Sequence, residues 1–153
     1  METASHCQCE CGAASFSVRG APLMRGFCHC TICQAFNEAP FADITLFRRR
    51  DVEMPAADSV AYRNYASPAM LYRGKCVKCH KPAVEYMDFP LMPDVVIVPT
   101  GTISNQAIVP SPTLHIFYDK RQQDVDDGLP KHRGYLASQC AFGWHLLKAL
   151  AKK

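Results

Sequence analysis

Three cysteines and a histidine occupy four of the six positions in the stretch CHCTIC, residues 28–33. Thiolates are soft, strong metal ligands, and cysteines two and three residues apart on a tight turn can direct their sulfurs at one ion. Three thiolates leave a tetrahedral zinc ion one ligand short. The fourth place belongs either to water or a substrate, which marks a reactive site, or to another protein ligand, which closes the site and makes it structural.

Eight of the nine cysteines fall into three clusters, and only Cys140 stands alone. The clusters are Cys7/Cys9/Cys11, Cys28/Cys30/Cys33 and Cys76/Cys79. An odd number of cysteines in C-x-C and C-x-x-C spacings is typical of metal ligands in a reducing compartment rather than of disulfides. The sequence therefore predicts at least one metal site.

The division of these cysteines into sites follows from loop length. The 42 residues between Cys33 and Cys76 far exceed the roughly 15 to 20 of a common zinc ribbon. We therefore favour a site that joins an N-terminal C-x-C pair to Cys76 and Cys79 and leaves the central cysteines separate. Such a closed four-thiolate site would clip the N-terminal strand to a central hairpin and act mainly on stability.

Two histidines are candidates near the central cysteines. His29 lies between Cys28 and Cys30, and the chain direction that points both cysteines at a metal points this residue away, toward solvent or the surroundings of the ligands. His115, on a short apolar segment, is either a side chain that lines a pocket or a core histidine with a backbone partner.

The elements that must position these residues are short strands. Alternating or apolar segments separated by prolines predict strands at residues 15–18, 41–47, 60–66, 69–73, 83–89, 95–98 and 114–118. The C-x-x-C at 76–79 falls on the turn of a predicted hairpin. The fold class we predict is mainly β with antiparallel sheets, in one domain over residues 1–153.

One helix is predicted to close the chain at residues 135–151. Apolar residues recur there at intervals of three and four, which is the period of a helix face. They are Leu136, Cys140, Trp144, Leu147 and Ala151. We expect this face to pack on the β core, and Cys140 to be a buried, inert thiol.

Composition and charge restrict the classes of function. Hydrophobic residues make up 48% and charged residues 20% of the 153, as in ordinary globular domains. The formal charge of +3 treats cysteines as neutral, and seven thiolates on two zinc ions would bring it to about zero. Attraction to nucleic acid then has little support beyond a local patch, Arg48 to Arg50.

The sequence also contains no stretch that indicates a membrane protein. No segment reaches the roughly 18 apolar residues of a membrane span, and the first residues, METASH, lack a basic start followed by an apolar run. We expect a cytoplasmic protein that does not bind membranes, and we leave open whether it forms a homo-oligomer.

Six segments occur in an order that resembles the glutathione-dependent formaldehyde-activating enzyme family, which includes the centromere protein V group. They are CECG at 9–12, CHCTIC at 28–33, CVKC at 76–79, GTI at 101–103, PTLHIF at 112–117 and DGLP at 127–130. The resemblance covers roughly residues 5 to 135. His80 stands where the family usually has a glycine, and histidine tolerates a left-handed backbone better than most residues.

The resemblance implies a fold similar to the Mss4-like, or β-tent, architecture, with two zinc ions. By the family's pattern, a structural zinc would be held by Cys9, Cys11, Cys76 and Cys79. A reactive zinc would be held by Cys28, Cys30 and Cys33. Cys7 then becomes an extra thiol, a spare or nearby ligand.

The resemblance also implies a reaction, in which glutathione adds to formaldehyde to give S-hydroxymethylglutathione. We therefore expect a zinc-dependent carbon–sulfur lyase or synthase that takes a small-molecule thiol and an aldehyde. His115 and Asp127 are its candidate acids from their order in the chain.

The alternative is a non-catalytic binding module, in which zinc only shapes a β surface for a protein or nucleic-acid partner. The Arg48 to Arg50 patch is its best feature. A fourth protein ligand on the central zinc, such as His29 or Cys7, would favour this alternative.

Overall fold

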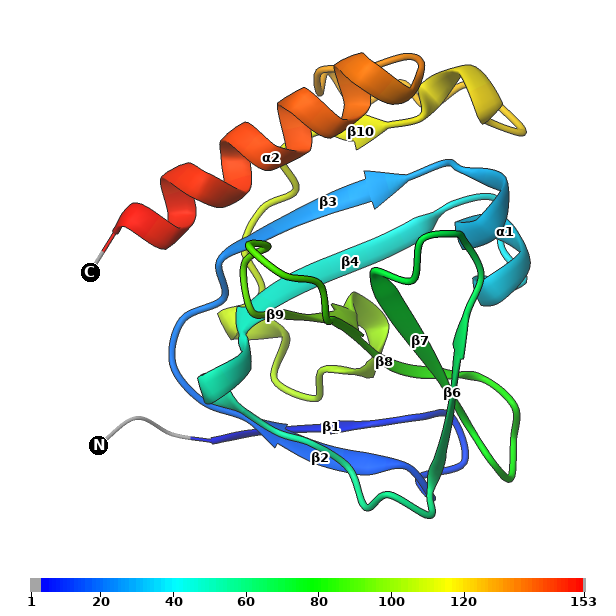
Figure 1. The fold of residues 1–153 in the computed structure, drawn as a ribbon, viewed down its shortest axis with the longest axis vertical. Coiled ribbons are helices and arrows are strands. Elements are labelled where there is room, and N and C mark those ends of the chain that lie inside the picture. Colours follow the sequence, from blue (N-terminus) through cyan, green and yellow to red (C-terminus); the bar gives the residue numbers. More distant parts are fainter. Residues whose placement is uncertain (1–3, 153) are drawn as a thin grey trace.

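Two β-sheets and one long helix build the computed structural model, which describes residues 4–152 (Figure 1). The small sheet has the order β1-β2-β5, and the large sheet has the order β10-β3-β4-β9-β8-β7-β6. The strands are β1 (Ser5–Gln8), β2 (Ser15–Val18), β3 (Met24–Cys28), β4 (Ala42–Arg48), β5 (Val52–Glu53), β6 (Val60–Asn64), β7 (Leu71–Cys76), β8 (Pro82–Met87), β9 (Val95–Pro99) and β10 (His115–Ile116). The helices are α1 (Thr31–Asn37) and α2 (Tyr135–Ala151). The mainly β, Mss4-like prediction is confirmed.

The predicted strands all form, and the prediction of antiparallel sheets is wrong at one edge. β10 runs parallel to β3, with His115 opposite Phe27 and Ile116 opposite Cys28. A parallel neighbour requires a long connection, and the chain between the end of β3 at Cys28 and the start of β10 at His115 provides one. This pairing brings the segment around His115 to the end of the strand that carries Cys28.

The sequence prediction missed β1, β3, β5 and α1. Helix α1 spans seven residues and begins directly after Cys30, so it contains too few turns for a helical period to be recognised. Cys30 is the residue that caps its N-terminus, because the Cys30 sulfur accepts a hydrogen bond of 3.3 Å from the backbone N–H of Cys33. The central cysteines therefore lie on a strand end, a cap and a helix.

The hydrophobic core has two parts, one on each face of the large sheet. Strand β9 contributes to both, because Val96 and Val98 lie in the part shared with the small sheet, while Val95 and Ile97 lie in the part beneath α2. Alternate residues of a strand face opposite sides, so a wholly apolar strand such as β9 is one that is buried on both faces. β9 therefore lies at the centre of the fold, between the two parts of the core.

Helix α2 has the predicted bounds, but the prediction of its buried face is wrong. Leu136, Trp144 and Leu147 are 75%, 63% and 59% exposed, and Cys140 is also exposed. Ser138 and Leu146 are buried instead. The period of a helix does not reveal which side packs when both sides are apolar, and here the side that carries Leu146 fits the sheet. No helix within residues 4–152 is long and apolar enough to cross a membrane.

Candidate metal centres

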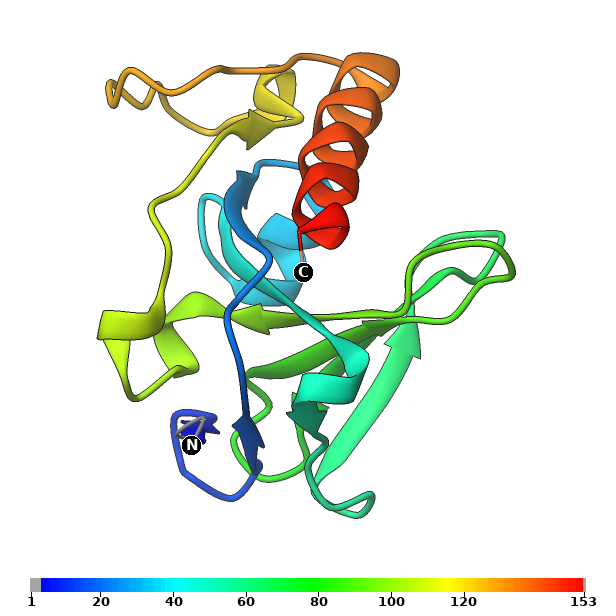
Figure 2. The same ribbon diagram turned by 90° about the vertical axis from the view of Figure 1, so that its left-hand side faces the viewer.

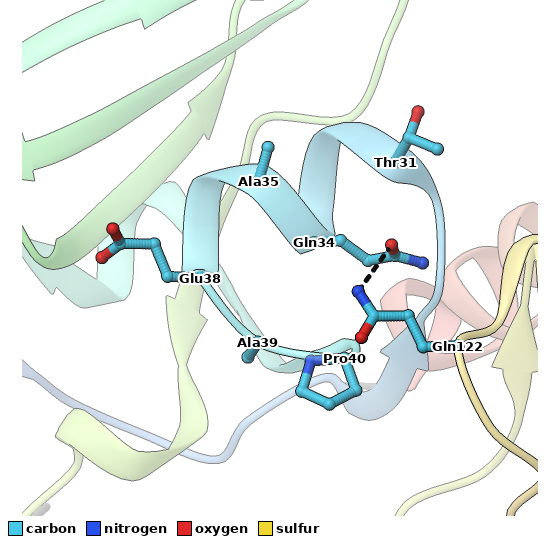
Figure 3. Close-up of a pocket in the computed structure, with 7 residues that line it drawn as sticks. All are labelled: Thr31, Gln34, Ala35, Glu38, Ala39, Pro40 and Gln122. Carbon is cyan, nitrogen blue, oxygen red and sulfur yellow. Dashed lines mark hydrogen bonds between the residues drawn. The ribbon is translucent and has the colours of Figure 1, made fainter.

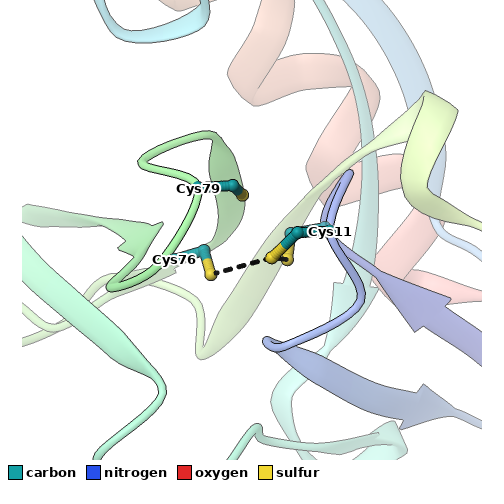
Figure 4. A group of neighbouring side chains, drawn as sticks. Cys11, Cys76 and Cys79 are labelled. Atoms are coloured by element: carbon teal, nitrogen blue, oxygen red, sulfur yellow. Dashed lines mark hydrogen bonds between the residues drawn. The ribbon is translucent and has the colours of Figure 1, made fainter.

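Four cysteines from two distant segments converge, and Figure 4 labels three of them, Cys11, Cys76 and Cys79. Cys9 and Cys11 lie in the turn between β1 and β2, whereas Cys76 ends β7 and Cys79 lies in the turn between β7 and β8. Their sulfurs lie within 4.8 Å of one another, and the Cys9–Cys11 and Cys11–Cys76 distances are both 3.7 Å. A tetrahedral zinc ion with bonds of about 2.3 Å separates its sulfurs by about 3.8 Å. The donor set therefore fits zinc.

The backbone around the four-cysteine group helps to orient its sulfurs. Backbone N–H groups of Ala14 and Lys78 donate to the sulfurs of Cys9 and Cys76, at 3.3 and 3.4 Å. His80 adopts a left-handed conformation, with φ of 59°, so this turn forms without the glycine usual at its position. These contacts stabilise thiolate charge before any metal binds.

Cys7 does not join this group. Its side chain is fully buried in the core part between the two sheets, and burial raises the pKa of its thiol to about 12. A thiol that stays protonated and lies in the core is a packing residue. The interpretation of Cys7 as a spare ligand is therefore wrong.

The second group consists of Cys28, Cys30 and Cys33, whose sulfurs also lie within 4.8 Å of one another. We call it the cysteine trio. Hydrogen bonds from the thiols of Cys28 and Cys33 lower the pKa of the Cys30 thiol. A divalent metal binds such clustered cysteines as thiolates and displaces their protons. The trio therefore fits a metal with three sulfur ligands.

Within residues 4–152, no fourth cysteine, histidine or carboxylate joins the trio in a metal-binding group. His29 turns away from it, because its Nε2 atom shares a hydrogen bond of 2.8 Å with Nδ1 of His115. This agrees with the expectation that His29 surrounds the ligands rather than joining them.

A line of hydrogen bonds extends from His29 to the surface. His115 donates from Nε2 to a carboxylate oxygen of Asp127 at 2.6 Å, and Lys131 donates to the other oxygen at 2.9 Å. Burial opposes the charge of Asp127, but its bonds from Lys131 and His115 outweigh burial and lower its pKa. In the tautomer of His115 that donates from Nε2 to Asp127, Nδ1 accepts from Nε2 of His29, which leaves Nδ1 of His29 as an acceptor.

His115 is fully buried and both ring nitrogens are engaged. A side chain in this state cannot contact a substrate directly. It holds the ring of His29, which is also buried and lies against Phe41 and Tyr118, with ring centroids 5.0 and 5.1 Å away. Nδ1 of His29 has no hydrogen-bond partner in the described part of the chain.

A buried ion pair supports the trio from the other side. Arg73 on β7 and Glu85 on β8 are paired residues of adjacent strands, and Nη1 of Arg73 lies 3.0 Å from a carboxylate oxygen of Glu85. The same nitrogen lies 3.7 Å from the sulfur of Cys33. Burial opposes the charge of the guanidinium, but Glu85 and Cys33 outweigh it and raise the pKa of Arg73. Sequence reasoning missed this pair because no motif links residues 33, 73 and 85.

A shallow hollow of about 410 Å³ opens on the outer side of α1 (Figure 3). It begins at Thr31, the residue after Cys30, and is lined by Thr31, Gln34, Ala35, Glu38, Ala39, Pro40 and Gln122. Gln122 reaches over the helix and donates a hydrogen bond of 3.1 Å to the side chain of Gln34. The hollow presents amide and hydroxyl groups, which suit a polar, peptide-like ligand.

The basic patch Arg48 to Arg50 is largely engaged within the fold. Arg48 donates to backbone carbonyls at the C-terminal end of α2, among them that of Lys152 at 3.0 Å. Arg49 donates to the carbonyl of Val52, and Arg50 pairs with Asp51. Arg48 and Arg49 therefore serve the fold, whereas the Arg50 side chain is 80% exposed.

Comparison with known proteins supplies a family and a fold. The model of a family described as glutathione-dependent formaldehyde-activating enzyme matches residues 4–120. A solved structure of a Rhodobacter sphaeroides protein is similar over 70% of this chain and 97% of its own, with a TM-score of 0.54 and 16% sequence identity. No curated protein matches the chain significantly. The family match ends at residue 120, before α2 begins at Tyr135.

Proposed function

Because the chain belongs to the glutathione-dependent formaldehyde-activating enzyme family, we propose that it is a zinc-dependent carbon–sulfur lyase or synthase that joins a small thiol to an aldehyde. The family supports glutathione and formaldehyde as the substrate class. We infer two zinc ions, a structural one on Cys9, Cys11, Cys76 and Cys79 and a reactive one on the cysteine trio.

The observation that carries this proposal is the separation of the trio from the four-cysteine group. The four-cysteine group is complete by itself, so the trio does not have to contribute to a structural site. Its three sulfurs converge, and His29 is held away from them by His115. Three protein ligands with a free fourth place are the arrangement of a catalytic zinc site.

The reaction needs no oxidant or reductant. The thiol loses its proton, its sulfur forms a bond to the carbonyl carbon, and the π bond of the carbonyl becomes a C–O single bond whose oxygen takes a proton. Bound zinc would supply a Lewis acid that makes thiol ionisation easier at neutral pH. The remaining task of the site is to hold the two reactants together.

The residues around the trio adjust its charge and shape. Three thiolates and one zinc ion carry a net charge of about −1. Arg73, 3.7 Å from the Cys33 sulfur, withdraws part of this charge by donating a hydrogen bond. The line from Asp127 through His115 holds the ring of His29, so we assign His115 a positioning role that acts through His29 and through the chain between Cys28 and Cys30.

Substitution of one trio cysteine tests the proposal. We expect Cys30→Ser to lower the zinc content from two ions to one per chain, to leave a folded protein, and to abolish the formation of the glutathione–formaldehyde adduct. Cys140→Ser is the matched control, because Cys140 is exposed and belongs to neither group, and it should keep two ions and full activity. Unchanged adduct formation by Cys30→Ser after loss of one ion would refute the proposal.

A further inference from the structure

The outward side of α2 is an unusual surface for a small protein. We define the outer face of α2 as Leu136, Cys140, Gly143, Trp144 and Leu147. Its large side chains are between 59% and 75% exposed. The helix forms the outermost layer of the fold beyond β10 and β3 (Figures 1 and 2), so no other element of the described chain covers this face.

The helix is apolar on both sides. Its inward side packs Phe142, Leu146 and Leu150 into the core part beneath it. Lys148 is the only Asp, Glu, Lys or Arg among the 17 residues of α2. A helix that is apolar all round is normally buried all round. A helix that lies on a membrane surface instead carries many basic residues on its polar side, and α2 has no such side.

The spacing of the outer face matches the seam of a helix pair. From Cys140 the exposed apolar residues recur at steps of four, three and four, through Trp144 and Leu147 to Ala151, which is the alternation of two-helix packing. α1 has only seven residues. The described chain therefore offers one helix with a matching seam, and this is α2 itself.

We propose that the outer face of α2 is a homodimer contact in which α2 packs antiparallel against α2 of a second copy. A two-fold axis at the middle of the face places Trp144 of each copy against Gly143 of the other. Gly143 has no neighbour within 4 Å of an added Cβ atom, so internal packing does not require this helix-weakening residue, whereas a hollow for the second tryptophan does. The antiparallel direction also keeps the two Lys148 charges apart.

The area of the face sets the expected strength. A tryptophan offers about 150–250 Å², and with the exposed fractions above the face amounts to on the order of 500 Å² per chain. This lies in the upper part of the range for the largest apolar patch of a monomer, about 300–600 Å². Two such faces would bury on the order of 1,000 Å², at the low end for specific interfaces. We therefore expect a dimer with a dissociation constant in the micromolar range.

Sedimentation of the metal-loaded protein over a concentration series tests the dimer. The wild-type chain should change from monomer to dimer between about 1 and 100 μM. Leu147→Glu should raise the dissociation constant at least about tenfold, because it buries a charge in the contact. Ala57→Glu is the matched control, since this exposed residue lies in the turn between β5 and β6, outside α2, and should not alter association.

Circular dichroism and zinc content keep the test independent of folding and of catalysis, because both should be equal in the two variants. A wild-type chain that remains a monomer at 100 μM would overturn the proposal, as would equal effects of Leu147→Glu and Ala57→Glu. Binding of the monomer to vesicles of mixed neutral and anionic lipid, lost in Leu147→Glu, would assign the face to a membrane surface and would equally overturn it.

Discussion

The ion pair between Arg73 and Glu85 is the feature whose removal should have the clearest consequence. The side chains are only 11% and 4% exposed, and the charged atoms lie 3.0 Å apart. Arg73→Met removes the positive charge and leaves Glu85 buried without a partner. Glu85→Gln leaves the opposite charge uncompensated beside the trio.

The expected loss follows from burial. Removing one partner of a buried pair costs about 3–5 kcal/mol, because the remaining charge loses its solvation and its counter-ion. The two losses should not add, since the double variant Arg73→Met/Glu85→Gln removes both charges of the pair and leaves neither one without its partner. We expect the double variant to be at least about 2 kcal/mol more stable than the sum of the single losses predicts.

Acidity should change the cost of losing Arg73. Burial raises the pKa of Glu85 even in the presence of the arginine, so without Arg73 the carboxyl takes a proton more readily. A protonated carboxyl carries no buried charge. Arg73→Met should therefore be less destabilising at pH 5.5 than at pH 8, relative to the wild type.

Urea unfolding at saturating zinc, with zinc content measured on each variant, is the suitable assay. The matched control is Arg25→Met, because Arg25 makes two hydrogen bonds to Asp43, at 2.9 and 2.7 Å, but this pair is 24% and 33% exposed. More exposed pairs contribute about 1 kcal/mol or less. Equal losses for Arg25→Met and Arg73→Met, or additive losses within the Arg73–Glu85 cycle, would refute the argument that burial decides the cost.

Two further predictions concern the core and pH. Gly74→Ala should destabilise the protein by about 3 kcal/mol or more in urea unfolding, because its Cβ atom would lie 2.5 Å from Val60 and 2.8 Å from the carbonyl oxygen of Val84; a loss below 1 kcal/mol would contradict this. Burial lowers the pKa of His29 to about 4, so between pH 6.5 and 4 the unfolded chain binds more protons than the folded one. Stability should therefore fall as pH decreases through this window, by at most about 3 kcal/mol, and His29→Gln should remove that part of the slope; an unchanged slope would count against it.

Much of the fold could be predicted because its signals are local. Residues 15–18 alternate as a strand does, and residues 95–98 form an apolar run, and both segments are strands in the structure. The bounds of α2 follow from its period. The cysteine trio lies within six consecutive residues, so its convergence depends mainly on a turn and one capping bond.

The sequence alone therefore determined most of the strands, α2, the compact trio and the family motifs, because each depends on neighbouring residues. The tertiary structure decided which face of α2 is buried and that β10 runs parallel to β3. It also brought His115 to His29 from 86 residues away along the chain, and Arg73 to Cys33 from 40 residues away. The spacing of residues along the chain does not predict such long-range contacts, since they depend on how whole sheets pack. The same packing left the outer face of α2 exposed to solvent, although its residues are as apolar as those of the buried side.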